Sequence, residues 1–592
     1  MSLSENKAHS KGSYSAAGIN EIPAKEKNIP LDQLYQGDIP FILEIIPPSG
    51  RVIEAHDFLR VVNPETNNPG ILEFRLTIKK GELYNGAFLH TDIQDGHWAE
   101  IPFTRIPVNG DNESEDYSFN LKIPMPPGGY FSFRFYLENV NKGGTIRYWE
   151  PCNYHRLLID PPLVNNLRMY TLLPTVSGKI DEWTEELEHI SSMGFNAVHI
   201  LPFTAMGPSE SPYSAANYFE IDSHYLSQEG NFKTFEKFTD RLKNLGMSLC
   251  FDIVLNHVSD ASVLATSHGN WMVADPERED GLKRAGCWHQ GTWISWEDLV
   301  LINFDHPNPQ IRQEIYNYML EYVLFWIEKA KGCGALIRLD NLHSSNDVFM
   351  KWLLSELSKK VPEVPVLSEF FGSNEHLFQG VTEFGLNILT ANTWESPFAP
   401  MLTDYIRNIH KEDNPVRYYL SPTSHDTETA AELFGTVDSS IPRYFVCALM
   451  GTGQTGIVQG FEYGWSRKIN FIGRHKKGNF RGDRDFTNTI TEINYLLDKE
   501  AAFLQKGIEF VDTGDDSLIA GFRVDPDSGK TLFLATNFNT TEDKYFQLKS
   551  CRSCTPLLTS GAEIIKDETT GEFHSIKFSP CGICVLRVNK KK

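Results

Sequence analysis

Short apolar runs separated by turn residues dominate the chain from about residue 35 to residue 162. Runs such as FILEIIP, ILEFRLTI and YFSFRFYLE alternate with turn signals such as PPSG and NKGG. Short strands at this spacing are typical of an antiparallel sandwich. The pattern therefore predicts an N-terminal β-sandwich over 35–162, and the polar stretch before it, 1–34, is expected to be a flexible arm.

The pattern changes at about residue 163, where strand-like and helix-like segments begin to alternate. LRMYTLLP is followed by the amphipathic DEWTEELEHISSMG, and NAVHILPF is followed by FEKFTDRLKNLG. Strands and helices that alternate, with Gly at the helix ends, are typical of a parallel α/β fold. Eight strands can be counted between about 167 and 460. That number favours a closed (β/α)8 TIM barrel, over 163–504, rather than an open sheet.

Two further regions depart from the strand–helix alternation. Between the third barrel strand and the next helix, an aperiodic excursion at about 258–305 is long enough to suggest a functional insertion. It carries four candidate stacking platforms for a ligand, Trp271, Trp288, Trp293 and Trp296. From about residue 505 the helices stop, and the hairpin signal in SLIAGFRVDPDSGKTLFLATNFN predicts a small C-terminal β-domain over 505–592.

Charge narrows the kinds of partner. Lys and Arg number 55 and Asp and Glu 77, which gives a formal net charge of −22. Nucleic acids and anionic lipid surfaces are bound by clustered cationic side chains, so neither partner is expected. No apolar run approaches the roughly 18 residues of a spanning helix. The polar start and the nine cysteines, an odd number, fit a reducing cytoplasm. A cytoplasmic protein acting on a neutral substrate is expected.

The cysteines near the C-terminus allow two interpretations. Cys551 with Cys554, and Cys581 with Cys584, form two CxxC pairs, and two such pairs can complete a tetrahedral zinc site. The segment between the pairs is longer than in the usual zinc ribbon, however. SPCGICVLRV also fits a closing β-strand in which Cys acts as a small apolar residue. The strand interpretation is favoured, and no cofactor is expected.

The candidate chemistry lies at the ends of the predicted barrel strands, where the active site of such a barrel forms. The polar residues at these ends are Asp252, Asn256, His257, Arg338, Asp340, Glu369, His425 and Asp426. Retaining glycoside hydrolysis needs one carboxylate nucleophile and one protonated carboxylic acid, roughly 5–5.5 Å apart. The residue types at the strand ends match that requirement.

The sequence predicts different roles for these side chains. Arg338 lies two positions before Asp340, on the same face of its strand, and is expected to keep Asp340 ionised as a nucleophile. Glu369 lies in the apolar run VPVLSEFF, whose surroundings suit a general acid. Predicted ligands of the sugar ring are Asp426, His257 and His425, with Tyr213 as a stacking platform. Singly, each has an ordinary structural explanation, such as an ion pair or a packed histidine; their convergence favours a site.

Four segments, DIVLNHVSD, ALIRLDNLHSS, VLSEFFGS and SPTSHDTE, resemble the ordered signature regions of the α-amylase superfamily, glycoside hydrolase family 13. The resemblance covers roughly 163–500. It implies a nucleophile at Asp340, an acid/base at Glu369 and a transition-state stabiliser at Asp426. It implies that the excursion is the family's domain B, and that the subsite for the cleaved sugar is completed by Arg338, His257, His425 and Tyr213, with Asp252 as a supporting acid.

Finer detail resembles the 4-α-glucanotransferase half of glycogen debranching enzymes. RLDNLHSS followed by SEFFGSNE carries this likeness. His343 and Ser344 stand where common amylases have Lys-His, which implies a different acceptor side. Asn256 matches a calcium ligand of many members, so calcium remains an alternative to no cofactor. The expected function is cleavage of α-1,4-glucosidic bonds in glycogen, starch or maltooligosaccharides. Strict glucanotransfer, a catalytically silent glucan-binding role and the oligomeric state remain open.

Overall fold

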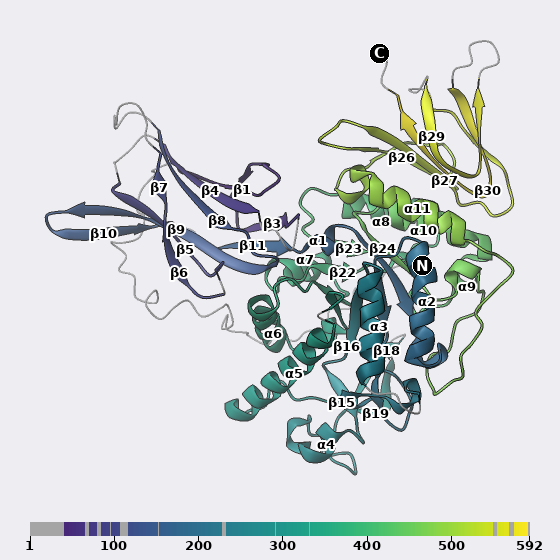
Figure 1. Ribbon diagram of the computed structural model, residues 1–592, viewed down its shortest axis with the longest axis horizontal. Coiled ribbons are helices and arrows are strands. Elements are labelled where there is room, and N and C mark those ends of the chain that lie inside the picture. Colours follow the sequence, from purple (N-terminus) through teal and green to yellow (C-terminus); the bar gives the residue numbers. More distant parts are fainter. Residues whose placement is uncertain are drawn as a thin grey trace.

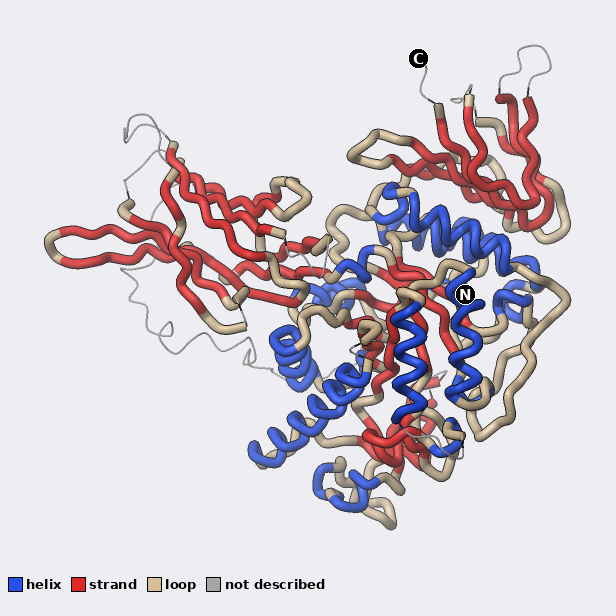
Figure 2. The backbone as a smooth tube through the Cα atoms, in the orientation of Figure 1, coloured by secondary structure: helices blue, strands red, loops and turns tan. Residues whose placement is uncertain are grey.

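The computed structural model describes residues 41–589, apart from 65–69, 80–83, 95, 107–115, 152, 228–231, 290–291, 331, 549–552 and 567–572. The arm expected over 1–34 lies outside the described residues. Figure 1 and Figure 2 show a central part built of strands and helices, with one β-rich part on each side of it.

Two β-sheets form the N-terminal part. The first has the order β2-β1-β4-β8-β7, with β1 (Phe41–Ile46), β2 (Ile53–Glu54), β4 (Ile71–Ile78), β7 (Thr104–Arg105) and β8 (Tyr117–Pro124). The second has the order β3-β11-β9-β5-β6, with β3 (Phe58–Val62), β5 (Gly86–Thr91), β6 (Ala99–Pro102), β9 (Gly129–Asn141) and β11 (His155–Asp160), and β10 (Gly144–Trp149) pairs with β9. Apolar residues of both sheets share one core, where the ring centroids of Phe74 and Phe133 lie 5.4 Å apart. This part is therefore a β-sandwich.

A buried carboxylate fastens the sandwich to the central part. Asp160, at the end of β11, is fully buried and accepts hydrogen bonds from Arg60 at 2.7 Å and from Asn387 at 2.9 Å. Arg417 adds an ion pair to the same carboxylate at 3.3 Å. A buried carboxylate is stable only when it is paired in this way, so these contacts hold the two parts together.

Eight parallel strands form the barrel: β12 (Leu167–Leu172), β13 (Ala197–Ile200), β16 (Ser248–Ile253), β20 (Ala335–Leu339), β21 (Val366–Ser368), β22 (Ile388–Thr390), β23 (Tyr418–Tyr419) and β24 (Gln454–Val458). They are paired in this order, and β12 also pairs with β24. A parallel bridge from Leu420 to Thr455 joins the last two strands and closes the ring. The predicted TIM barrel is confirmed.

Helices follow the barrel strands and cover the outside of the ring. They are α2 (Ile180–Ser192), α3 (Phe232–Asn244), α5 (Pro309–Lys329), α6 (Asp347–Lys360), α7 (Asn374–Thr382), α8 (Ala399–Ile409), α10 (Ser440–Leu449) and α11 (Thr487–Lys499), with the short α1 (Pro162–Asn165), α4 (Val263–Ser267) and α9 (Ala430–Phe434). In α2, apolar residues at helical spacing such as Trp183 and Leu187 are buried. Gly194 follows with φ 83°, a conformation that ends helices. None of the described helices is long and apolar enough to cross a membrane.

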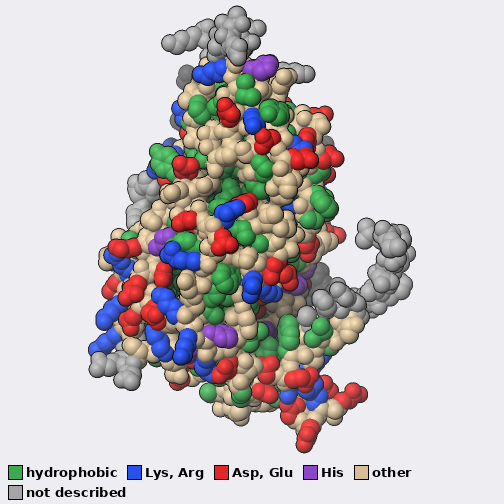
Figure 3. Space-filling model, turned by 90° about the vertical axis from the view of Figure 1, so that its right-hand side faces the viewer, with side chains coloured by type: hydrophobic (Ala, Val, Ile, Leu, Met, Phe, Trp, Pro, Cys, Tyr) green, Lys and Arg blue, Asp and Glu red, His purple; other side chains and the backbone are tan. Residues whose placement is uncertain are grey.

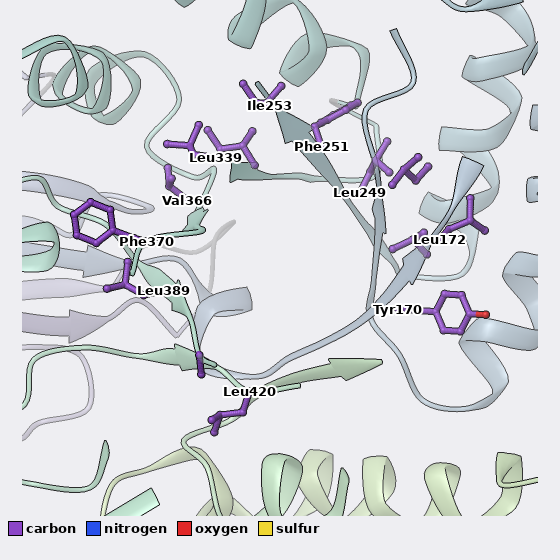
Figure 4. Packing of buried hydrophobic residues seen from close by; sticks show 14 of the residues in the cluster. Tyr170, Leu172, Leu249, Phe251, Ile253, Leu339, Val366, Phe370, Leu389 and Leu420 are labelled. Carbon is purple, nitrogen blue, oxygen red and sulfur yellow. The ribbon is translucent and has the colours of Figure 1, made fainter. Parts of the chain in front are cut away.

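Side chains of each barrel strand alternate between the helices and the barrel interior, because a strand turns successive residues to opposite faces. In β16, Leu249, Phe251 and Ile253 belong to the large apolar core outside the ring, as Figure 4 shows. Cys250, between them, belongs to a separate apolar cluster inside the ring. The same alternation directs Asp252 inward, near the end of the strand.

Two small sheets follow the ends of β13 and β16. One pairs β14 (Thr204–Met206) with β15 (Ala215–Ile221); the other has the order β17 (His257–Ser259), β19 (Thr292–Leu301) and β18 (Arg284–His289), within the predicted excursion. One expectation about this region is wrong: Trp271 is only 6% exposed and packs against the Tyr318 ring, so it offers no free face to a ligand. Trp293 is 45% exposed, and the Trp288 side chain lies outside the described residues.

A single sheet makes up the C-terminal part. Its strands are β25 (Glu509–Phe510), β26 (Leu518–Val524), β27 (Thr531–Asn537), β28 (Lys544–Phe546), β29 (Cys554–Lys566) and β30 (Phe573–Val588). Residues of one face, such as Leu534 and Val585, join the core that surrounds the barrel. The fully buried Arg523 donates to the carbonyl oxygens of Gly451 at 2.7 Å and Ala502 at 2.6 Å. This sheet is therefore packed on the barrel helices.

Candidate active site

A single guanidinium, that of Arg338, joins three carboxylates at the mouth of the barrel. Arg338 lies on the inner face of β20 and is 5% exposed. Its Nη1 donates to Asp252 Oδ1 at 2.7 Å and to Asp340 Oδ1 at 3.0 Å. Its Nη2 donates to Glu369 Oε2 at 2.9 Å. The barrel thus brings together four of the predicted site residues, from the ends of β16, β20 and β21.

The carboxylates in this cluster differ electrostatically. Burial raises the pKa of Asp340 well above its ordinary value, and Glu369 and Asp252 add to the effect while Arg338 opposes it. This differs from the expectation that Arg338 keeps Asp340 ionised, because the guanidinium is shared with two other carboxylates. For Asp252, burial also raises the pKa, but Arg338 and His199 together lower it below the ordinary value. The site without a sugar therefore favours a proton on Asp340.

Glu369 has a polar setting instead of the predicted apolar one. Its Oε2 accepts the Arg338 bond and a second hydrogen bond, at 2.9 Å, from the backbone N–H of Asn341. Its neighbours Ser368 and Phe370 are buried, whereas the Glu369 side chain keeps a fifth of its surface exposed. The apolar letters around Glu369 in the sequence belong mainly to residues that face the helices, because the strand alternates.

A chain of ring and hydroxyl groups lies beside Arg338. The Tyr213 hydroxyl donates to Asp252 Oδ2 at 3.0 Å and lies 2.7 Å from His425 Nε2. The Tyr213 and His425 rings are nearly parallel, with centroids 5.9 Å apart. His425 Nε2 also lies 3.0 Å from Asp426 Oδ2, whose side chain is about half exposed. Tyr213 is thus tied into the polar network, and its role as a stacking platform for a sugar stays a prediction.

His199 belongs to this network, although the sequence analysis did not select it. It lies on the inner face of β13 and is buried, with its Nε2 3.0 Å from Asp252 Oδ2 and its Nδ1 3.1 Å from the Thr171 hydroxyl. Burial lowers its pKa, which favours a neutral ring that donates through Nε2. The signal was present in NAVHIL, where His199 occupies an inward position of a barrel strand.

His257 and His343 lie next to backbone groups of the network residues Tyr213 and Glu369 and are not among the described hydrogen-bond partners of Arg338. Burial lowers the pKa of His257 to about 4, and its Nδ1 contacts the side-chain oxygen of Asn256. That oxygen is the atom expected to bind calcium, so the cation would compete with the His257 ring for it. His343 is exposed, with Nδ1 3.4 Å from the Glu369 carbonyl oxygen and its ring against Phe371.

The segment between β24 and α11, residues 459–486, forms one wall of the site. It runs along the side of the barrel in Figure 1, and Figure 3 shows that side, where Lys and Arg side chains are interspersed with Asp and Glu. Its ion pairs join Arg474 to Glu210 and Asp222, Lys477 to Glu186, and Arg484 to Asp438. From this segment, Phe471 packs edge-on against Tyr213 and His425. The sequence analysis did not predict this wall.

Of the four cysteines in the two predicted pairs, Cys554, Cys581 and Cys584 lie in the described part of the sheet. Cys551 lies outside the described residues, and Cys554 and Cys584 stand opposite Val588 and Thr559 in the β29–β30 pair. Among the residues that the structure describes, no group of three or more His, Cys, Asp or Glu side chains is arranged to hold a metal ion. Cys584 is buried in the apolar core of the sheet.

Comparisons with known proteins agree with this geometry. Residues 162–277 match the family model described as the glucanotransferase domain of glycogen debranching enzyme. Over 395 residues the chain is 22% identical to the alpha-1,4-glucan:maltose-1-phosphate maltosyltransferase of Picrophilus torridus, with 62% of this chain and 60% of that protein covered. The fold matches that of an alpha-amylase from Lactobacillus plantarum with a TM-score of 0.58 at 17% identity, over 72% of this chain and 99% of that one.

The family-model match and the curated relatives support membership of the α-amylase superfamily, glycoside hydrolase family 13. The chain is also 23% identical, over 308 residues, to the intracellular maltogenic amylase of Bacillus subtilis, with 48% of this chain and 49% of that protein covered. The chain thus spans 60% of the first relative's length and about half of the second's. The order of the four motifs along the barrel agrees with α-amylase superfamily membership.

Proposed function

We propose that the protein is a retaining α-glucan-active enzyme that cleaves α-1,4-glucosidic bonds of glycogen, starch or maltooligosaccharides by double displacement. The observation that carries the proposal is the shared guanidinium of Arg338, which holds Asp340 and Glu369 side by side at the barrel mouth. Retaining glycosidases need two carboxyl groups held close together. The relatives named as maltosyltransferase and maltogenic amylase support the α-glucan class.

In the first proposed step, a carboxylate oxygen of Asp340 bonds to the anomeric carbon while the bond from that carbon to the glycosidic oxygen breaks. Glu369 gives its proton to the departing oxygen, which leaves as a sugar hydroxyl. The raised pKa of Asp340 favours a proton on Asp340 in the site without a sugar. The proposed step requires that this proton lies on Glu369 when a sugar is bound. The product of this step is a β-linked glycosyl ester of Asp340.

In the second step, a hydroxyl group of water or of another glucan attacks the anomeric carbon. The oxygen of that hydroxyl bonds to the anomeric carbon while Glu369 takes the hydroxyl proton. The ester bond to Asp340 breaks at the same time. Both steps use only carboxyl groups and hydroxyls, so we keep the expectation that no cofactor takes part. The anomeric configuration of the substrate is retained.

Other side chains have supporting roles in this proposal. Asp252 is buried and holds Arg338, His199 and the Tyr213 hydroxyl in place. Asp426, half exposed beside His425, is suited to accept hydrogen bonds from sugar hydroxyls. On the other side of Glu369, the exposed His343 is suited to contact the acceptor.

A strict 4-α-glucanotransferase is the second candidate. The match of 162–277 to the glucanotransferase domain of debranching enzyme favours it. The test is incubation with maltoheptaose and chromatography of the products, with the Asp340→Asn variant as control. Chains longer than the substrate would establish transfer, and shorter chains alone would establish hydrolysis. Unchanged maltoheptaose, maltooligosaccharides and glycogen would overturn the proposal and leave a glucan-binding role.

We also propose a cytoplasmic location. Five cysteines of the described part form no disulfide and support it, namely Cys250, Cys333, Cys447, Cys581 and Cys584, because reducing compartments keep thiols unpaired. Localisation of a tagged protein by fractionation tests this, and recovery outside the cytoplasm would contradict it.

A further inference from the structure

Asn341, the residue after Asp340, has a left-handed backbone conformation with φ 45° and ψ 41°. In the described part of the chain, three residues other than glycine have positive φ: Glu210, Asn341 and Cys581. Residues with a Cβ atom rarely adopt this region, and Asn tolerates it better than most. Such a conformation at the mouth of an active site requires a local cause.

The left-handed turn directs two successive amides at Glu369. The Asn341 N–H donates to the Glu369 side chain, at Oε2, and the Leu342 N–H donates to the Glu369 carbonyl oxygen at 3.0 Å. One amide thus holds the side chain of Glu369 and the next holds its backbone. An extended or right-handed Asn341 would rotate one of the two amides away, so the conformation is coupled to the Glu369 contact.

The two N–H groups that donate to the Glu369 carboxyl reach the same atom. The N–H groups of Arg338 and Asn341 each lie 2.9 Å from Oε2. An oxygen that accepts two N–H groups has little room for a proton of its own, because an acid hydrogen there would point at one of the donors. Oε1 is therefore the oxygen suited to carry the proton.

We infer that Asn341 is a positioning residue: its left-handed backbone fixes the Glu369 carboxyl so that Oε1 delivers the proton to the departing sugar oxygen. This inference rests on the proposed function. In the proposed step the proton moves from Glu369 Oε1 to the glycosidic oxygen as the bond between that oxygen and the anomeric carbon breaks. Asn341 contributes its backbone amide, so the side chain matters only through the conformation it allows.

The test compares two substrates that differ in their need for the acid. Maltoheptaose has a sugar alkoxide as leaving group and needs protonation, whereas maltosyl fluoride loses fluoride with little help. Asn341→Val, with a β-branched side chain that disfavours the left-handed region, is expected to lower kcat/KM on maltoheptaose about 100-fold. On maltosyl fluoride, followed with a fluoride electrode, kcat/KM is expected to change less than about 3-fold, since protonation is not required there.

Two control variants separate positioning from general strain. Asn341→Gly adopts the left-handed region freely, keeps the amide and is expected to restore kcat/KM on maltoheptaose to near the parent value. Cys581→Val places the same β-branched side chain at the left-handed φ of 58° in β30, away from the barrel mouth, and is expected to leave both kcat/KM values unchanged. If Asn341→Val does not fold, Asn341→Ala replaces it, with a smaller effect in the same direction.

Each outcome bears on the inference. Equal losses on both substrates by Asn341→Val, in a protein whose thermal unfolding is unchanged, would overturn it in favour of a merely structural role. Full activity of Asn341→Val on maltoheptaose would overturn it as well. Asp340→Asn separates the proposed function from this inference: full activity of that variant on both substrates would reject the function itself. A selective loss on maltoheptaose that Asn341→Gly reverses would establish the inference.

Discussion

Two layers of the barrel interior are built by the same strands and have opposite character. The deeper layer includes Cys250, Leu336 and Leu367, which are 0–2% exposed and form an apolar cluster. Two residues further along the same three strands stand Asp252, Arg338 and Glu369, which are linked by hydrogen bonds.

One period of the strand alternation, two residues, thus separates a packed apolar layer from a charged site. The apolar layer supplies rigidity directly beneath the charged one, which itself costs stability because its charges are desolvated. Strand ends at this face of a TIM barrel serve chemistry, and the layers below serve packing. Substitutions in the two layers should therefore separate activity from stability.

The largest expected effect is in the charged layer. Asp340→Asn and Glu369→Gln should each lower kcat on maltooligosaccharides by about 1,000-fold or more, because each removes a group required for bond cleavage. The thermal midpoint should stay within a few degrees of the parent or rise, since carboxylate repulsion is relieved. Steady-state kinetics and calorimetry on the same samples measure both. Appreciable turnover by either variant would contradict the assignment.

The apolar layer should show the reverse. Leu336→Ala removes a fully buried side chain inside the barrel and should lower the free energy of unfolding by about 2–5 kcal/mol, through lost burial and a cavity. Activity per folded molecule at 25 °C should remain close to that of the parent. Urea unfolding and kinetics test this. A large loss of kcat with little loss of stability would show that the two layers are not separate.

Another carboxyl, that of Glu462, is buried outside the charged layer and allows a pH test. Its Oε1 accepts a hydrogen bond from the Tyr170 hydroxyl at 2.7 Å, and burial raises its pKa to about 7. Between the unfolded value, about 4.3, and about 7, the folded protein binds a proton that the unfolded chain has released. Stability from this group is therefore present below the unfolded value and is lost as pH rises through the folded value, by up to about 4 kcal/mol.

Glu462→Gln, which cannot ionise, should remove this dependence. Its free energy of unfolding should fall less than that of the parent between pH 5 and pH 7.5, and it should be the more stable protein at the higher pH. Urea unfolding at several pH values measures the difference. Parallel pH dependences in the two proteins would show that Glu462 is ionised alike in the folded and unfolded states.

The smallest effect is expected at the surface of the 459–486 segment. Lys477→Ala breaks exposed ion pairs with Glu182 and Glu186 and should cost less than about 1 kcal/mol, because exposed pairs are screened by water and salt. The loss should shrink in 0.5 M NaCl. Melting curves at low and high salt provide the measurement, and a salt-independent loss would indicate packing instead of charge.

Most of the barrel was predictable because its signals are local. Strand and helix periods alternate along the chain, and the polar residues after each strand can be read directly. Tyr213 shows the limit of this approach: the sequence suggested a stacking ring, and the structure adds hydrogen bonds from its hydroxyl to Asp252 and His425. These partners lie far apart in the chain and meet only when the ring of strands closes.

His199 and Phe471 mark two different failures of prediction. His199 occupies an inward position of a predicted strand, so its place in the polar network could have been predicted from the sequence. Phe471 lies in a segment without periodicity, and nothing local indicates that it packs on Tyr213 and His425. The ion pairs that hold this segment join it to α2, to the hairpin of β14 and β15 and the residue after it, and to the stretch between α9 and α10. Charge alone does not specify such partners.

The sequence by itself determined the barrel, its flanking β-domains and which acids stand at strand ends, because these follow from repeats of two and of about 3.6 residues. Only the tertiary structure decided how Arg338 is shared and in which direction the pKa of Asp340 shifts. The structure also shows that the Asn341 backbone is left-handed and that its N–H donates to the Glu369 carboxyl. Electrostatic shifts and backbone strain depend on groups brought together across the closed ring, and no local pattern records those distances.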